Sequence, residues 1–233
     1  MKKRIPKIKK KYFILFLSIS LLLFALNLFW NSIQIKKIFI VSPVRQVNGM
    51  SVFNGQNIIF FNNNRITDTL LTSNIYLKNI NLKKKFPSTI FLDLTWRTPY
   101  TEIISSSSPF FVDNQGFPAL SEGNLTGTLP QINMPRMLVT DKNPDWRVLK
   151  ALSLLNQLSS SAINCSRLTF DEANSQITVL IEDSVELLIP YNFDPARLTA
   201  SLQIIISRFR IEGKFIRSID FRFDKPLVIL KNE

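Results

Sequence analysis

An uninterrupted apolar run near the N-terminus constrains this chain more than any other feature. Residues 13–30 read FILFLSISLLLFALNLFW; none is charged, and 13 of the 18 are Leu, Ile or Phe. As a helix rising ~1.5 Å per residue, the run reaches ~27 Å, close to the ~30 Å hydrocarbon thickness of a bilayer. Tyr12 and Trp30 bracket it, and such aromatic residues are enriched at membrane–water interfaces. The sequence therefore predicts a transmembrane helix over 12–30.

The alternative for this run is a cleavable signal peptide. Signal peptides have a shorter apolar core of about 7–15 residues, followed by small residues at the cleavage site. The run here is longer and ends in Leu28, Phe29 and Trp30, which favours a retained anchor. Residues 1–11 hold seven of the 29 cations and no acid. The positive-inside rule therefore predicts a single-pass protein of the cell (inner) membrane, with this tail in the cytoplasm beside anionic lipid and the remaining residues extracytoplasmic.

The remaining composition argues against several classes of function. Without the basic tail the chain has 22 cations and 17 acids, an ordinary surface charge that predicts no nucleic-acid binding. The absence of histidine excludes Ser-His-Asp triads and histidine-ligated metals. No glycine-rich phosphate loop is present, so we expect no enzyme and no cofactor. Cys165, the only cysteine, cannot form an internal disulfide; we expect a buried small hydrophobic residue, with a reactive thiol as the alternative.

The segment after the apolar run has the pattern of a small α+β unit. Short apolar, β-branched or alternating stretches predict strands at residues 33–41, 80–86 and 90–96, and a short strand or a turn at residues 57–61. Ile66, Leu70 and Leu71 have helical spacing and predict a helix over 63–73, capped by one of Asn62, Asn63 and Asn64. Four serines, Ser105–Ser108, are the best candidate for a domain boundary, although a surface loop has the same composition.

A second, β-rich unit is expected after the serines. Strands are predicted at residues 110–112, 117–120, 167–170, 176–181, 185–189, 215–223 and 227–230. Asp145 and Asp194 are expected to cap helices over 146–158 and over 195–212, the second ended by Gly213. We expect the last strand at a sheet edge, where unpaired backbone groups accept a partner strand; a short, shielded edge is the alternative. The fold class is therefore α+β.

Five segments, in this order after one anchor, resemble the bacterial cell-division family FtsQ/DivIB. They read IKKIFIVSPV, GQNIIFF, NIYLKNINLKKKFPSTIFLDLTWRTPYTEI, FFVDNQGFP and SIDFRFDKPLVI. The resemblance implies a POTRA domain of β-α-β-β type over 33–104 and an FtsQ-type β domain over 109–233, after the tail (1–11) and the helix (12–30). Two departures stand out: only residues 45–56 occupy the place of the family's first POTRA helix, and Trp96-Arg97 replaces a common Glu-Arg.

The resemblance also implies a function. Members of this family are non-enzymatic divisome scaffolds at the septum that bind FtsB/DivIC-like and FtsL-like single-pass coiled-coil proteins and link them to the septal peptidoglycan synthesis machinery. Their partner adds along the last strand of the β domain, which by motif places Arg222, Phe223, Asp224 and Lys225 at the contact. The family's POTRA hairpin meets other division proteins, although residues 83–85 also read as ordinary solvated lysines. Two alternatives remain: another POTRA-containing envelope protein in secretion or transport, and a membrane-anchored enzyme.

Overall fold

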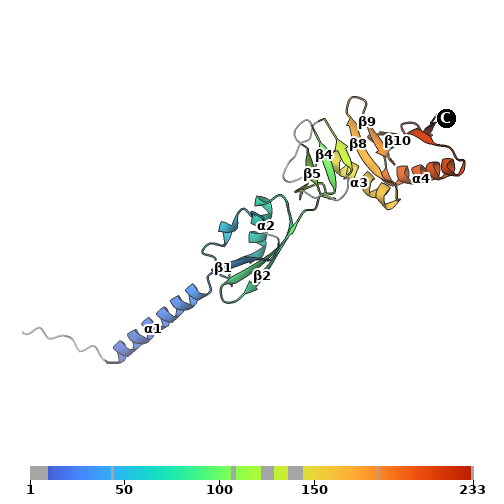
Figure 1. Ribbon diagram of the computed structural model, residues 1–233. Helices are drawn as coiled ribbons and strands as arrows, with labels where there is room; N and C mark the ends of the chain where they lie inside the picture. Colours follow the sequence, from blue (N-terminus) through green and yellow to red (C-terminus); the bar gives the residue numbers. More distant parts are fainter. Residues whose placement is uncertain are drawn as a thin grey trace, which may run out of the picture. The chain divides into compact units, whose positions relative to one another are not determined.

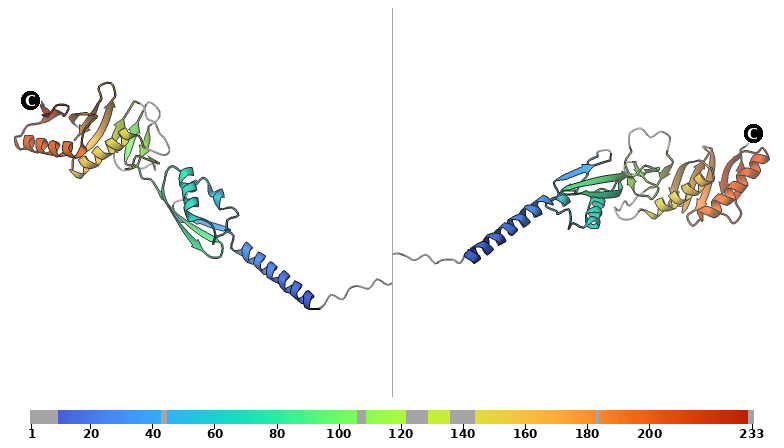
Figure 2. Two further views of the ribbon diagram at one scale, coloured as in Figure 1. Left: turned by 180° about the vertical axis from the view of Figure 1, so that it is seen from behind. Right: turned by 90° about the horizontal axis from the view of Figure 1, so that it is seen from below.

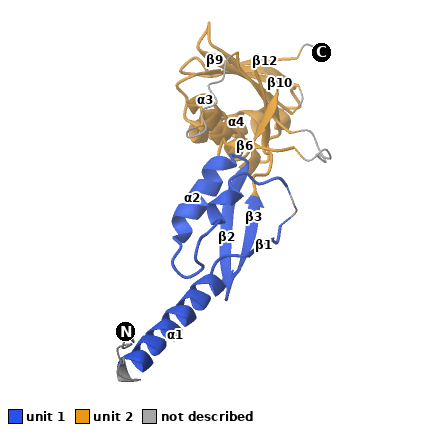
Figure 3. Cartoon of the chain, turned by 90° about the vertical axis from the view of Figure 1, so that its left-hand side faces the viewer, with its two compact units in different colours: residues 1–95 blue, residues 96–233 orange. Residues whose placement is uncertain are grey.

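The chain folds into two compact units, residues 1–95 and residues 96–233 (Figure 3). The computed structural model describes residues 10–42, 45–105, 109–121, 129–135, 144–182 and 184–231. Within them the architecture is mixed α/β, with one apolar N-terminal helix, a three-stranded sheet in unit 1 and a nine-stranded sheet in unit 2 (Figures 1 and 2).

The N-terminal helix α1 spans Lys10–Ser32 and contains the predicted span 12–30. Its segment Tyr12–Ser32 has a mean hydropathy of 2.4 with none of it buried inside the protein, so the helix is long and apolar enough to cross a membrane. Polar side chains in the run bond within the helix. The Ser18 hydroxyl donates to the Leu15 carbonyl at 2.8 Å, and the Asn31 amide donates to Asn27 Oδ1 at 3.0 Å. Such internal bonds reduce the cost of placing polar groups in hydrocarbon.

The rest of unit 1 packs one helix against a small sheet. Its elements are β1 (Lys37–Ile40), the 3₁₀ helix η1 (Met50–Phe53), α2 (Asn63–Ser73), β2 (Leu77–Lys85) and β3 (Thr89–Trp96). The strand order is β1-β3-β2, with β1 parallel to β3. Ile66 and Leu70 of α2 are buried, as are Leu77 of β2 and Ile90 of β3. The Asn62 side chain accepts from the backbone N–H groups of residues 64 and 65, which confirms one of the three predicted caps.

The structure settles two details of unit 1 that concern the segment between β1 and α2. Residues 57–61, predicted as a short strand or a turn, form a turn with one isolated bridge, between Asn57 and Gln34. The Asn57 side chain accepts from the backbone N–H of Ile59 at 3.0 Å, and its carbonyl accepts from that of Phe61 at 3.1 Å, which curls the run. In residues 45–56 the only helix is η1, in keeping with the short spacing.

Unit 2 is built on a mixed sheet with the order β12-β11-β10-β9-β8-β7-β4-β5-β6. The strands are β4 (Thr101–Ile104), β5 (Phe110–Val112), β6 (Pro118–Ala119), β7 (Gln131–Asn133), β8 (Cys165–Asp171), β9 (Gln176–Ile181), β10 (Val185–Pro190), β11 (Ile216–Asp220) and β12 (Leu227–Leu230). Helices α3 (Trp146–Ser160) and α4 (Pro195–Ile211) cover one face (Figure 1). Asp145 and Asp194 cap them as predicted. Buried Leu154, Leu158, Leu168 and Val179 belong to the shared core.

The boundary between the units is not where the serine run predicted it. Residues 101–104, assigned to the first domain from the sequence, form β4, which pairs with β5 and β7 of the large sheet. The units therefore divide between Thr95 and Trp96 rather than at Ser105–Ser108; residues 106–108 lie outside the described part of the chain. Strand β7 is a second correction, because the sequence analysis predicted no strand between residues 120 and 167.

Candidate functional site

The candidate site is the terminal hairpin, defined as β11, the turn at residues 221–226 and β12. Strand β12 is antiparallel to β11 and is the outermost strand of the sheet at this side. The Lys231 N–H donates to the Phe215 carbonyl at 2.8 Å, which extends the pairing past the strand. On the outer side of β12 no strand pairs with it anywhere in the described ranges. The predicted edge strand is therefore confirmed.

The side chains of β12 divide between the core and the solvent. Val228 and Leu230 pack against the core of unit 2. Leu227 and Ile229 point to the other face and are 54% and 48% exposed. Edge strands are commonly protected by charged side chains or proline within the strand. Here Pro226 and Lys231 flank β12, and the strand itself presents two large apolar side chains beside unpaired backbone groups.

The turn of the terminal hairpin is stabilised by a bidentate ion pair between Asp220 and Arg222, which we call a clamp. The Arg222 guanidinium donates to both carboxylate oxygens of Asp220, at 2.9 Å to Oδ1 from Nε and 2.6 Å to Oδ2 from Nη2, and its backbone N–H donates to Oδ1 at 3.0 Å. Arg222 Nη1 also donates to Gln176 Oε1 of β9 at 2.7 Å. Hydrogen bonding to Arg222 lowers the pKa of Asp220 despite partial burial, and the same bond raises the pKa of Arg222.

The four predicted contact residues lie in this turn rather than on the terminal strand. Arg222 is engaged with Asp220 and Gln176, so it positions the turn. Phe223 is 59% exposed, and Asp224 and Lys225 are exposed beside it. The predicted strand over 215–223 is shorter, because β11 ends at Asp220 where the ion pair bends the chain.

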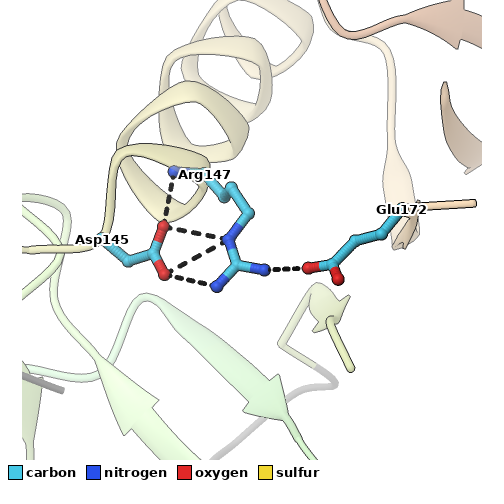
Figure 4. Close-up of polar contacts among 3 residues, drawn as sticks. All are labelled: Asp145, Arg147 and Glu172. Carbon is cyan, nitrogen blue, oxygen red and sulfur yellow. Dashed lines mark hydrogen bonds and ion pairs between the residues drawn. The ribbon is translucent and has the colours of Figure 1, made fainter. Parts of the chain in front are cut away.

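A second clamp with the same sequence pattern fastens the start of α3 (Figure 4). Asp145 caps the helix by accepting from the Arg147 backbone N–H at 2.9 Å, and it also accepts from the Arg147 side chain at 2.6 Å. The other side of that guanidinium forms an ion pair with Glu172. The hydrogen bond to Asp145 is the largest contribution that raises the pKa of Arg147. Each clamp has the form Asp-aromatic-Arg, with Trp146 in one and Phe221 in the other.

Both clamps converge on the turn between β8 and β9. Arg147 forms an ion pair with Glu172 in this turn, and Arg222 donates a hydrogen bond to Gln176 at the start of β9. Asp171 organises this turn by accepting from the Asn174 side chain at 2.6 Å and from Gln176 Nε2 at 3.2 Å; the bond from Asn174 is the largest cause that lowers the pKa of Asp171. The bond between Arg222 and Gln176 thus ties the terminal hairpin to this turn. Sequence reasoning missed these clamps, although the repeated Asp-aromatic-Arg triplet was a visible signal.

A small pocket adjoins the terminal hairpin. It has a volume of about 270 Å³ and is lined by residues that include Val185, Ile206, Arg210, Phe215 and Lys231. Two exposed apolar side chains lie at this end of the unit, Ile211 at 88% and Phe215 at 75% exposure. Pockets for drug-sized ligands are usually about 300–1,000 Å³, so this one suits a side chain of a bound polypeptide better than a cofactor.

Other chemistry is sparse in the described residues. Among them no group of three or more His, Cys, Asp or Glu side chains could hold a metal ion. Cys165 is half-buried rather than fully buried, packs against the core, and has its pKa raised to about 12 by burial. Its Sγ lies 3.8 Å from the Arg167 carbonyl, to which the thiol donates a weak hydrogen bond. At neutral pH the thiolate needed for nucleophilic chemistry is therefore scarce.

No family model matches the sequence, and no curated protein matches it. Within the described residues, the chain combines a membrane-compatible helix with an apolar sheet edge that no other strand pairs, and the turn before that edge is held by the Asp220–Arg222 ion pair.

Proposed function

We propose that this chain is a membrane-anchored, non-enzymatic scaffold of the FtsQ/DivIB type. In this proposal α1 crosses the cell membrane with residues 1–11 in the cytoplasm, and the two units lie outside at the division septum. Unit 2 then binds FtsB/DivIC-like and FtsL-like single-pass proteins and links them to septal peptidoglycan synthesis. The resemblance of five ordered segments led to this proposal, and the terminal hairpin supplies its physical basis.

The observation that carries the proposal is the unpaired outer side of β12. A partner segment that adds there as a strand would form main-chain hydrogen bonds with β12, while its side chains meet Leu227 and Ile229. Phe223 lies at one end of the strand and the pocket beside Phe215 at the other, so apolar contacts continue past both ends. Main-chain bonds would supply affinity, and these flanking side chains would supply specificity.

Fixed geometry supports binding at this edge. A strand that must order before it binds loses conformational freedom on association, and that loss lowers affinity. The clamp of Asp220 and Arg222, tied to Gln176, connects the turn before β12 to β9 and so restricts the conformations open to it. The edge is therefore pre-organised for strand addition.

The proposal is tested by site-specific crosslinking in the full-length chain. A photo-crosslinking amino acid replaces Ile229 on the exposed face of β12, and the matched control replaces exposed Gln157 of α3. Both variants are co-expressed with the FtsB/DivIC-like and FtsL-like proteins of the same cell. We expect crosslinks to the coiled-coil pair from position 229 and none from position 157.

Two outcomes would contradict the proposal. A complex that forms without any crosslink from position 229 would place the partner on another surface. A chain that never associates with the coiled-coil pair, but co-purifies with a secretion or transport assembly, would favour the alternative envelope function.

A further inference from the structure

The end of unit 1 next to α1 brings together exposed apolar and basic side chains from three segments. We call it the α1-adjacent surface and define it as Lys36, Ile59, Phe60, Lys83, Lys85 and Phe86. Ile59, Phe60 and Phe86 are 43%, 70% and 62% exposed, and the three lysines are exposed as well. These residues come from the chain after α1, from the turn before α2, and from the β2–β3 hairpin (Figure 3).

Backbone hydrogen bonds hold the three segments at the end of α1. The Ile35 N–H donates to the Gln56 carbonyl at 3.0 Å, and the Ile58 N–H donates to the Ile33 carbonyl at 2.9 Å. The Lys36 N–H donates to the Ser88 carbonyl at 2.9 Å, which places the β2–β3 turn at the same end. The Lys84 ammonium lies 4.0 Å from the centre of the Phe61 ring and joins β2 to the turn before α2.

The folded unit begins without a linker after the apolar run. Ile33, three residues after Trp30, is only 4% exposed and belongs to the core of unit 1. Three residues of helix rise ~4.5 Å, whereas the headgroup layer of one leaflet is about 5–8 Å thick. The Trp30 and Phe60 ring centres are 6.0 Å apart, and the rings are stacked. If Trp30 marks the membrane boundary, Phe60 lies within the headgroup layer.

Charge favours the same contact. Residues 12–95 contain eight Lys or Arg and only two acids, Asp68 and Asp93, whereas residues 96–233 contain 14 cations and 15 acids. Lys83 and Lys85, two residues apart on β2, are both exposed, and Phe86 follows Lys85 in the chain. Aromatic and aliphatic side chains among lysines are the composition of surfaces that bind anionic lipid at the interface.

We infer that the α1-adjacent surface is a second membrane contact, in which Phe60 and its neighbours enter the headgroup region and the lysines bind anionic lipid. The inference rests on the proposed membrane anchoring by α1. This contact would fix unit 1 on the bilayer surface, so that α1 is not its sole attachment.

The test measures membrane depth in the full-length chain, reconstituted into vesicles of three parts phosphatidylethanolamine to one part phosphatidylglycerol. On a Cys165→Ser background, single cysteines replace Ile59, Leu22 in the middle of α1, or Thr95, and each carries an environment-sensitive fluorophore. Thr95 is exposed at the far end of β3, about 20 Å along the strand from Thr89. We expect lipids spin-labelled near the headgroup to quench position 59 at least about twofold and to leave position 95 unchanged.

Two variants identify the cause of the quenching. Phe60→Ser should reduce quenching at position 59 because it removes the most exposed ring. Lys83→Gln with Lys85→Gln should remove the part that depends on phosphatidylglycerol. Lys78→Gln, on the same strand but at its opposite end, should have no effect. Since no other protein is present, quenching assigns the surface to lipid.

The controls separate this inference from the proposed anchor. Quenching at position 22 by deep labels, with position 59 as unquenched as position 95, would overturn the second contact and leave the anchor intact; the surface would then be open to a protein. No quenching at position 22 would overturn the anchor, and the second contact with it.

Discussion

Replacing Phe223 by alanine tests whether the turn of the terminal hairpin contacts a partner. Phe223 is 59% exposed, and a phenylalanine side chain buries ~200 Å² when fully covered. A partner that covers the exposed part would bury about 120 Å², which at ~25 cal/mol per Å² corresponds to ~3 kcal/mol. Half coverage gives ~1.5 kcal/mol, so affinity for the coiled-coil pair should fall by about 10- to 150-fold.

The assay is a titration of the fluorescently labelled coiled-coil pair into full-length protein held in lipid nanodiscs. Phe39→Ala is the matched control, because Phe39 is a 50% exposed phenylalanine of β1 in the other unit. It should leave the affinity unchanged, and the thermal unfolding of the Phe223→Ala variant should match that of the parent. An affinity loss no larger than that of Phe39→Ala would refute the placement of Phe223 in the interface.

Three further predictions concern the ion-pair clamps and the thiol. Arg222 lowers the pKa of Asp220 in the folded state, so the stability contributed by the Asp220 carboxylate is present above the unfolded pKa of ~3.9 and is lost as pH falls through the folded pKa. Asp220→Asn should therefore make the free energy of unfolding less dependent on acid pH. An unchanged dependence would contradict the clamp. Arg147→Met should lower the free energy of unfolding in urea by ~3 kcal/mol, because it leaves the Asp145 carboxylate buried without the guanidinium. The control is Glu172→Gln, at a side chain that is 48% exposed, and it should lower the same free energy by under ~1 kcal/mol. With its pKa raised to about 12, Cys165 should react with iodoacetamide at pH 8 far more slowly in the folded chain than in urea, and equal rates would show that the thiol is accessible and ordinary.

The helices were predictable from local signals. Asn62, Asp145 and Asp194 each precede an apolar pattern with helical period, and each caps a helix in the structure. The buried face of α3 was less predictable, since Leu149 is 45% exposed while Leu154 and Leu158 are buried. A short helix offers several registers of similar periodicity, and only the tertiary contacts choose between them.

The missed strands depend on pairings between distant residues. β4 and β7 have four and three residues, too few for alternation to be visible. β4 pairs in parallel with β7 at the register Glu102–Gln131, and β7 pairs in parallel with β8 at the register Gln131–Arg167. Nothing local in these segments indicates such partners, and the sequence alone therefore favours a boundary at the serines.

The candidate site was predictable in outline. The terminal position of residues 227–230 and their apolar pattern predicted an edge strand, and the structure confirms the edge. The place of Arg222 was not predictable from alternation, because the bidentate contact with Asp220 ends the strand one residue after the buried Ile219. A side-chain ion pair decides the backbone path there, and a pattern of apolar residues carries no information about it.

The parallel pairing of β1 and β3 has a mechanical consequence. β1 is joined to α1 at its N-terminal end, and β3 continues into unit 2 at its C-terminal end. A pull applied between the bilayer and a cargo on unit 2 would act on opposite ends of two strands that run the same way. The hydrogen bonds between Lys37–Ile40 and Thr89–Leu92 would then be loaded together in shear, rather than broken one after another, and the intervening chain would carry no tension.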